Sequence, residues 1–142
     1  MVVRAGAGFD TIDFNYCSTK GIYVANCPGK NASAVAELTM GLILSIDRRI
    51  AEGVNMLKNN QWNKGMFSKC RGIRGRTIGL IGAGNISQLV CKAAVALGME
   101  VLVHTRTIKP GLDEELGFTY CTSQDELLAR SDIVSLHVPN TP

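Results

Sequence analysis

The part of the sequence best suited to binding chemistry is a glycine turn, Gly82-Ala83-Gly84, continued by Asn85 and Ile86. The apolar run 77–81 precedes the turn, and a helix-like run follows it with apolar positions at Ile86, Leu89, Val90, Ala93 and Leu97. A buried strand that enters a glycine turn and then a helix aims backbone N–H groups and the positive end of the helix dipole at one spot. The pattern predicts that Gly82 and Gly84 hold the pyrophosphate of a dinucleotide.

The spacing to the next segment supports this interpretation. A second apolar run covers 99–103, and Thr105 follows Gly84 at a distance close to the roughly 20 residues that separate such glycines from the residue contacting the ribose. The third glycine position of the motif holds Ser87, a small residue that we expect to push the helix slightly outward. The alternative is a purely structural corner between strand and helix.

Composition indicates a packed globule. Of 142 residues, 46% are hydrophobic and only 19% are charged, which argues against disorder. The net charge of +3 is mild, and the densest basic stretch, 69–76, is broken by glycines and lacks aromatic residues, so we expect a solvated linker and no nucleic-acid partner.

Two further features bear on location. No apolar run approaches the roughly 18 residues of a membrane span, and no signal peptide is evident at Met1. The five cysteines are odd in number and never form a C-x-x-C pair. We therefore expect reduced thiols, no metal site, no membrane contact and a cytoplasmic protein.

The elements needed to position these residues follow from periodicity. The N-terminal part predicts a strand end at Val2-Val3, a helix over 13–20 and a strand over 22–25. A long helix begins near Ser33, capped by Asn31 or Ser33, and breaks near Gly53 before a second helical stretch that reaches Trp62. The polar segment 63–76 predicts a surface crossover.

The C-terminal half alternates between strands and helices. We predict strands over 77–81, 100–104, 118–120 and 132–138, helices over 85–97 and 123–129, and a turn at Pro110-Gly111. This alternation favours an α/β fold with a doubly wound parallel sheet and right-handed crossovers. Because a complete sheet of this type has about six strands, the predicted sheet is incomplete.

Several ordered segments resemble the D-isomer-specific 2-hydroxyacid dehydrogenases, and among them most closely the phosphoglycerate dehydrogenases. The match is collinear over nearly the whole chain. The segments that carry it are R-A-G-A-G-F-D-T-I-D at 4–13, G-I-Y-V-A-N-C-P-G-K-N at 21–31, A-V-A-E-L at 34–38, R-T-I-G-L-I-G-A-G-N-I at 76–86 and S-D-I-V-S-L-H-V-P at 131–139.

The resemblance implies a two-domain enzyme with its active site between the domains. Residues 1–30 would be the C-terminal part of a flavodoxin-like substrate domain, and residues 31–142 the connecting helix and the N-terminal part of a Rossmann domain that binds NAD or NADP. It also implies a homodimer, formed through the region of the connecting helix. The expected substrate is a small 2-hydroxy or 2-oxo acid.

The resemblance also assigns expected roles to individual residues. Backbone N–H groups near Ala5 and Gly6 would hold the substrate carboxylate, Arg4 would help to bind a substrate phosphate, and Ala7 would touch the nicotinamide. Asn85 and Ile86 match the positions that contact the pyrophosphate, Thr105 matches the position that contacts the ribose, and Val138 matches a wall of the cofactor site.

Thr105 departs from the phosphoglycerate dehydrogenase pattern, which has Asp at this position. A carboxylate accepts hydrogen bonds from the ribose 2′-OH and repels a 2′-phosphate, whereas neutral Thr105 followed by Arg106 favours that phosphate. We therefore predict a preference for NADP(H), as in the glyoxylate and hydroxypyruvate reductases of the family. The alternative is that Arg106 points into solvent.

The sequence offers no catalytic residue. The resemblance implies an Arg and a His–Glu pair in motifs that follow 132–139, so we expect them after residue 142. His104, His137 and Glu37 are expected to be structural or cofactor-wall residues, and the isolated chain is expected to be poorly stable and without turnover.

Two other functions stay open at this point. One is a non-catalytic dinucleotide-binding module that resembles the C-terminal-binding corepressors, and the other is a truncated product without a function of its own. The loop 4–8 and the segment 35–37 favour the enzymes.

Overall fold

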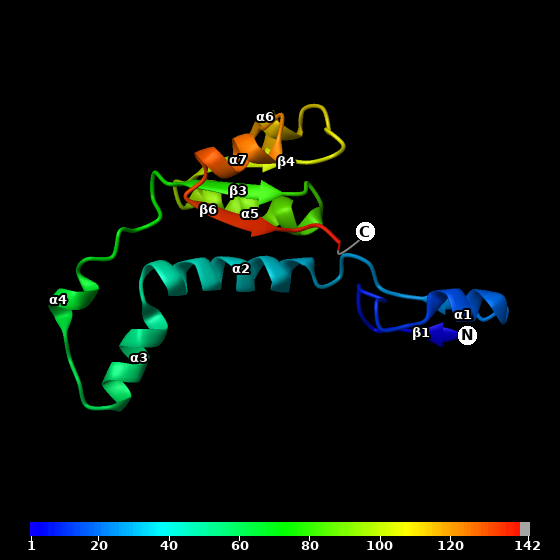
Figure 1. The fold of residues 1–142 in the computed structure, drawn as a ribbon, viewed down its shortest axis with the longest axis horizontal. Helices are drawn as coiled ribbons and strands as arrows, with labels where there is room; N and C mark the ends of the chain where they lie inside the picture. The colour runs from blue at the N-terminus through cyan, green and yellow to red at the C-terminus, as the bar shows by residue number, and fades with distance from the viewer. Residues whose placement is uncertain (140–142) are drawn as a thin grey trace.

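The computed structural model describes residues 1–139, and their main feature is a four-stranded parallel sheet (Figure 1). Its strands are β3 (Thr77–Ile81), β4 (Glu100–His104), β5 (Thr119–Tyr120) and β6 (Ile133–Leu136), arranged in the order β5-β4-β3-β6. Thr77 pairs with Glu100 and Ile78 with Ile133, so the carboxyl ends of β3, β4 and β6 lie at one edge. The predicted parallel α/β architecture is confirmed.

Helices cover both faces of this sheet. α5 (Asn85–Ala96) and α6 (Leu112–Leu116) lie on one face, where Ile78, Leu80 and Val90 are completely buried. α7 (Gln124–Arg130) covers the other face and buries Leu127. Gly79 permits this close packing, because a Cβ there would overlap the side chains of Leu127 and Ser131.

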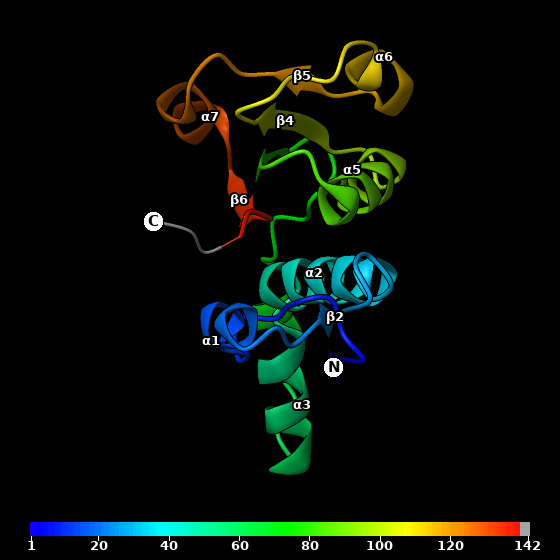
Figure 2. The ribbon, with the colours of Figure 1, turned by 90° about the vertical axis from the view of Figure 1, so that its right-hand side faces the viewer.

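The long helix α2 (Ala32–Asp47) packs against α5 and lies below both α5 and β6 in Figure 2, so it closes the side of the domain next to β6 (Figures 1 and 2). Ala36, Met40 and Ile43 face the core, because they recur at helical spacing along one side of α2. Asn31 occupies the N-cap position, as predicted, but its side chain makes no capping hydrogen bond.

The predicted helix break near Gly53 is wrong. The chain bends at Arg49, which has a φ of 55°, and α3 (Ile50–Lys58) then runs away from the sheet with Gly53 inside it (Figure 1). A Cβ on Gly53 would lie 3.8 Å from the ring of Phe67, an ordinary van der Waals contact, so the helix does not require glycine at this position. α3 ends before Trp62, which therefore lies outside the helix.

The crossover 63–76 contains a short helix that the sequence analysis did not predict, α4 (Lys64–Phe67). Asp47 fixes the return of the chain to the sheet, because its carboxylate accepts hydrogen bonds from Gly72 N at 3.0 Å and from Arg76 Nη1 at 2.9 Å. α6 was also missed, since only a turn was predicted at Pro110-Gly111. Ile73 of the crossover is buried in the core.

The N-terminal residues form a sheet of their own. β1 (Val2–Val3) and β2 (Val24–Ala25) pair with each other in parallel, and α1 (Phe14–Thr19) connects them in the sequence. This unit lies beyond the N-terminal end of α2 (Figure 1). Asp13 caps α1 by accepting a hydrogen bond from Tyr16 N. Among residues 1–139, no helix combines the length and the apolar character needed to cross a membrane.

Candidate functional site

The glycine turn joins the carboxyl end of β3 to the N-terminus of α5 and lies between the ends of two neighbouring strands. Gly82 N donates to the carbonyl of His104, which ends β4, at 2.8 Å. Gly82 has a φ of 104°, and a Cβ there would lie 2.7 Å from the carbonyl oxygen of His137. Only glycine therefore fits at residue 82.

Gly84 presents the opposite situation. It is the N-cap of α5 with a φ of −78°, and no heavy atom lies within 4 Å of the position that a Cβ would take. The folded chain itself therefore does not require glycine at this position. The N-terminus of α5 also has no side-chain cap, so its first N–H groups face open space. The space at Gly84 beside the uncapped N-terminus of α5 suits an anionic group that approaches the backbone closely.

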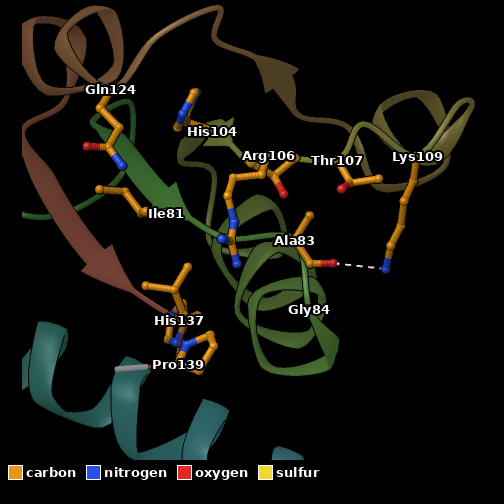
Figure 3. Close-up of a pocket in the computed structure, with 13 residues that line it drawn as sticks. Ile81, Ala83, Gly84, His104, Arg106, Thr107, Lys109, Gln124, His137 and Pro139 are labelled. Carbon is orange, nitrogen blue, oxygen red and sulfur yellow. Dashed lines mark hydrogen bonds between the residues drawn. The ribbon is translucent and has the colours of Figure 1, made fainter. Parts of the chain in front are cut away.

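An open pocket of about 530 Å³ lies at this edge of the sheet, bounded by the glycine turn and by the residues that follow β4 and β6 (Figure 3). It brings together Gly82, Gly84, Thr105, Arg106 and Val138, five of the predicted cofactor residues. The other lining residues are Ile81, Ala83, His104, Thr107, Lys109, Gln124, His137 and Pro139.

The electrostatic character of the pocket is positive. Arg106 and Lys109 both line it, and no aspartate or glutamate is found among the lining residues of the described chain. Figure 3 shows the Arg106 side chain extending into the pocket between the glycine turn and β6. Both cations lie in the segment that follows β4.

Both histidines belong to the wall of this pocket. His104 Nδ1 lies 3.2 Å from the carbonyl oxygen of Cys121, and His137 Nε2 lies 3.0 Å from Ser135 Oγ. Burial lowers the pKa of His137, because the half-buried ring loses the water that would stabilise its charged form. A neutral imidazole at this position adds no charge to the pocket.

Two predicted pyrophosphate residues lie beside the pocket and do not line it. Asn85 faces a separate hollow between α5 and the start of α2, where its side-chain nitrogen lies 3.0 Å from the position of a Cβ on Gly29. Ile86 packs against the core. Their backbone N–H groups, in the first turn of α5, are the atoms available to a ligand at Gly84.

The candidate substrate residues gather at a different place. Ala5, Gly6 and Ala7 line a hollow with Cys27, Lys30 and Asn31, and none of these residues lines the main pocket. Hydrogen bonds to two carbonyl oxygens fix the loop 4–8 in place. Gly6 O accepts from Cys27 N at 3.0 Å, and Ala7 O accepts from Asn26 Nδ2 at 2.7 Å. The Arg4 guanidinium donates to Thr11 Oγ1.

The sequence analysis did not identify Lys109 and Gln124 as pocket residues. Lys109 Nζ donates to the carbonyl of Ala83 in the glycine turn at 3.1 Å (Figure 3). Gln124 begins α7, and its position directly after the helix cap Ser123 was the available signal, because the N-termini of helices in parallel α/β folds face the carboxyl ends of the strands.

Ser87 lies in the first turn of α5 at 2% exposure, and its Oγ has no hydrogen-bond partner among the described residues. The third glycine position therefore accommodates a serine, at the cost of one unsatisfied hydroxyl.

Comparison with known proteins gives a consistent result. Residues 40–142 match the model of the D-isomer specific 2-hydroxyacid dehydrogenase, NAD binding domain. The chain is 43% identical to a hydroxypyruvate reductase of Thermotoga maritima, over 99% of this chain and 44% of that protein. It is 40% identical to a D-3-phosphoglycerate dehydrogenase of Methanocaldococcus jannaschii, over 100% of this chain and 27% of that protein.

Solved structures agree with this comparison. The fold superposes on D-lactate dehydrogenase from Aquifex aeolicus complexed with NAD and lactic acid with a TM-score of 0.84 and 36% identity, covering 99% of this chain and 42% of that one. The chain thus spans between about a quarter and somewhat less than half of the length of the curated relatives it matches.

Proposed function

Because this chain belongs to the D-isomer specific 2-hydroxyacid dehydrogenase family and carries its NAD-binding domain, we propose that it supplies the cofactor-binding part of an oxidoreductase. The reaction would transfer hydride between a nicotinamide dinucleotide and a small 2-hydroxy or 2-oxo acid. The observation that carries this proposal is the glycine turn, where a Cβ on Gly84 would meet no atom within 4 Å and which opens into a positively charged pocket.

The residues present fit a dinucleotide. Gly84 leaves space for a pyrophosphate beside the uncapped N-terminus of α5, while Thr105 and Val138 line the space available to the adenosine half. The nicotinamide, when bound, supplies or accepts the hydride. The chain itself would contribute binding, orientation and charge.

NADP(H) is the proposed preference of this site. Thr105 is half-buried and uncharged, Arg106 extends into the pocket, and the described lining holds no carboxylate to repel a 2′-phosphate. A charge-assisted hydrogen bond from Arg106 to that phosphate would contribute about 1.5–3 kcal/mol.

The substrate-binding part of the active site would lie in residues 1–30. We assign these residues to the substrate domain and place its boundary with the cofactor domain near residue 31. Among residues 1–139, the N–H groups of Ala5, Gly6 and Ala7 donate to no carbonyl or side chain, so they remain available to a carboxylate. The Arg4 guanidinium donates to Thr11 and keeps further N–H groups that can donate to a substrate phosphate, so phosphoglycerate, glyoxylate and hydroxypyruvate are all candidate substrates.

We expect no proton-transfer residue among residues 1–139. His104 and His137 both line the cofactor pocket and have partners there, and Glu37 is exposed on α2. We therefore expect the isolated chain to bind a cofactor without turning over a 2-hydroxy acid. The relatives named above are dehydrogenases and a reductase, and none of them is a corepressor.

A homodimer is the proposed assembly. Leu38, Leu42 and Ile46 are exposed on the side of α2 away from α5, and α3 adds exposed Ile50, Val54 and Leu57. An apolar face of this extent is typical of an interface. All five cysteines are unpaired, which supports a cytoplasmic location, and we expect no nucleic-acid partner.

Direct binding tests the proposed function. The chain is titrated with NADPH and NADH, and nicotinamide fluorescence is followed, with calorimetry as a second readout. We expect saturable binding of both dinucleotides and tighter binding of NADPH. Absence of binding by a chain whose circular dichroism shows a folded α/β domain would overturn the proposal.

A further inference from the structure

The segment that follows β4 folds back over the cofactor pocket and is tied to the glycine turn by one side chain. Lys109 Nζ donates to Ala83 O at 3.1 Å, and this bond joins residues 26 positions apart (Figure 3). Ala83 O also accepts from Gln88 Nε2 at 3.2 Å. The carbonyl therefore keeps a donor if the Lys109 ammonium moves to another acceptor.

The backbone of Lys109 is fixed from the opposite side by a single hydroxyl. Tyr120 OH accepts from Lys109 N and donates to Lys109 O, each at 3.2 Å. The Tyr120 ring packs edge-on against Phe118 with centroids 4.8 Å apart, and Phe118 belongs to the buried core. The main chain at Lys109 is thus anchored to β5, and only its side chain is free to change partner.

The charge of the pocket gives this side chain a second possible partner. Lys109 and Arg106 are its two lining cations, and the carbonyl that now holds Lys109 is neutral. A phosphate accepts the same hydrogen bond from the ammonium as a carbonyl does and adds the attraction between opposite charges. A phosphate placed near Arg106 would therefore draw the ammonium away from Ala83.

We propose that Lys109 is a second cation for a phosphate on the 2′ position of the bound ribose and that Tyr120 is the residue that positions it. This inference rests on the proposed function and adds a specificity determinant to the same site. With a ribose that carries no 2′-phosphate, Lys109 keeps its bond to Ala83, so its contribution is confined to NADP(H).

The test compares two nucleotides that differ by one phosphate, adenosine 2′,5′-bisphosphate and AMP, titrated calorimetrically into the 142-residue chain. Lys109→Met, which keeps the length of the side chain, is expected to weaken the bisphosphate about tenfold and to leave AMP unchanged. Lys109→Arg is expected to retain the preference. Tyr120→Phe, which removes only the hydroxyl, is expected to weaken the bisphosphate about threefold without affecting AMP.

Lys58→Met on α3 and Tyr23→Phe near β2 are the matched controls, since neither residue lines the pocket. Equal losses for both nucleotides in Lys109→Met, or no loss for either, would overturn the inference. If Arg106→Ala removes the preference for the bisphosphate and Lys109→Met does not, the proposed function stands and only this inference fails. A folded wild-type chain that binds neither nucleotide would overturn both.

Discussion

At the scale of single residues, Arg106 decides the proposed choice between the two dinucleotides. Its side chain extends into a pocket whose described lining holds no carboxylate. We expect Arg106→Ala to weaken NADPH about tenfold or more and to leave NADH unchanged, because only the 2′-phosphate needs the guanidinium. Fluorescence titration with both dinucleotides measures this, and an unchanged ratio of the two affinities would remove the basis for an NADP(H) preference.

The two glycines of the turn make separable contributions at this same scale. Gly82→Ala places a Cβ 2.7 Å from His137 O at a φ of 104°, so we expect a loss of unfolding free energy of about 2 kcal/mol or more. Gly84→Ala meets no atom within 4 Å. We expect it to change stability by less than about 1 kcal/mol and to weaken NADPH markedly.

Urea unfolding and NADPH titration of both variants check this contrast. Equal destabilisation by the two substitutions, or an unchanged NADPH affinity in Gly84→Ala, would contradict the assignment of Gly84 to the ligand.

At the scale of elements, Asp132 joins the start of β6 to the start of β3. Its carboxylate accepts from Thr77 N at 3.0 Å and lies 3.1 Å from Arg71 Nη1. The hydrogen bond from Thr77 N, followed by the attraction of Arg71 and Arg76, lowers the pKa of Asp132 below its ordinary value of 3.8. A lowered carboxyl pKa adds stability above the unfolded value, and that stability is lost as the pH falls through the folded value.

We therefore expect Asp132→Asn to destabilise the chain at pH 6 and to destabilise it less at pH 3, because part of the stabilisation by the lowered pKa is lost below the ordinary carboxyl value of 3.8. Urea denaturation of both proteins at the two pH values measures the difference. A difference in stability that does not depend on pH would show that Asp132 acts by shape alone. Asp125→Asn, in the first turn of α7, is the control.

Elements with strong local signals were predicted well. The bounds of β3 and β4 were predicted correctly, because each strand has apolar residues at its centre, Ile78 and Leu80 in β3 and 101–103 in β4. α6 was missed because it offers only Leu112 and Leu116 as apolar positions, too few to show a helical period. The bend at Arg49 was missed because an arginine with a positive φ carries no signal in the sequence, whereas Gly53 does.

The same distinction applies to the site. Gly82, Gly84 and Thr105 were found because their spacing follows from a strand, a turn and a helix in succession. Lys109 was not found, because its contact with Ala83 depends on a loop that folds back across the sheet edge. Contacts of this kind depend on the tertiary structure and cannot be predicted from the local periodicity of the sequence.

At the scale of the whole molecule, residues 50–67 form an arm, α3 to α4, with an apolar surface that no other part of residues 1–139 covers. Leu57 is 57% exposed and Trp62 77% exposed on this arm, which projects from the body in both ribbon views (Figures 1 and 2). Leaving such surface in water costs about 25 cal/mol per Å². A second copy offers the same apolar face, so a symmetric pairing would cover both arms at once.

We expect the wild-type chain to be a dimer at micromolar concentration and Leu57→Asp to be a monomer, because an unpaired carboxylate cannot be buried in such an interface. Multi-angle light scattering after size exclusion measures the mass of each. Leu128→Asp, a change at a 51% exposed leucine of α7, is expected to leave the dimer intact. NADPH affinity serves as the test of fold, since the cofactor pocket lies at the far edge of the sheet and none of its lining residues belongs to the arm. A wild-type monomer, or a dimer that survives Leu57→Asp, would place the interface elsewhere.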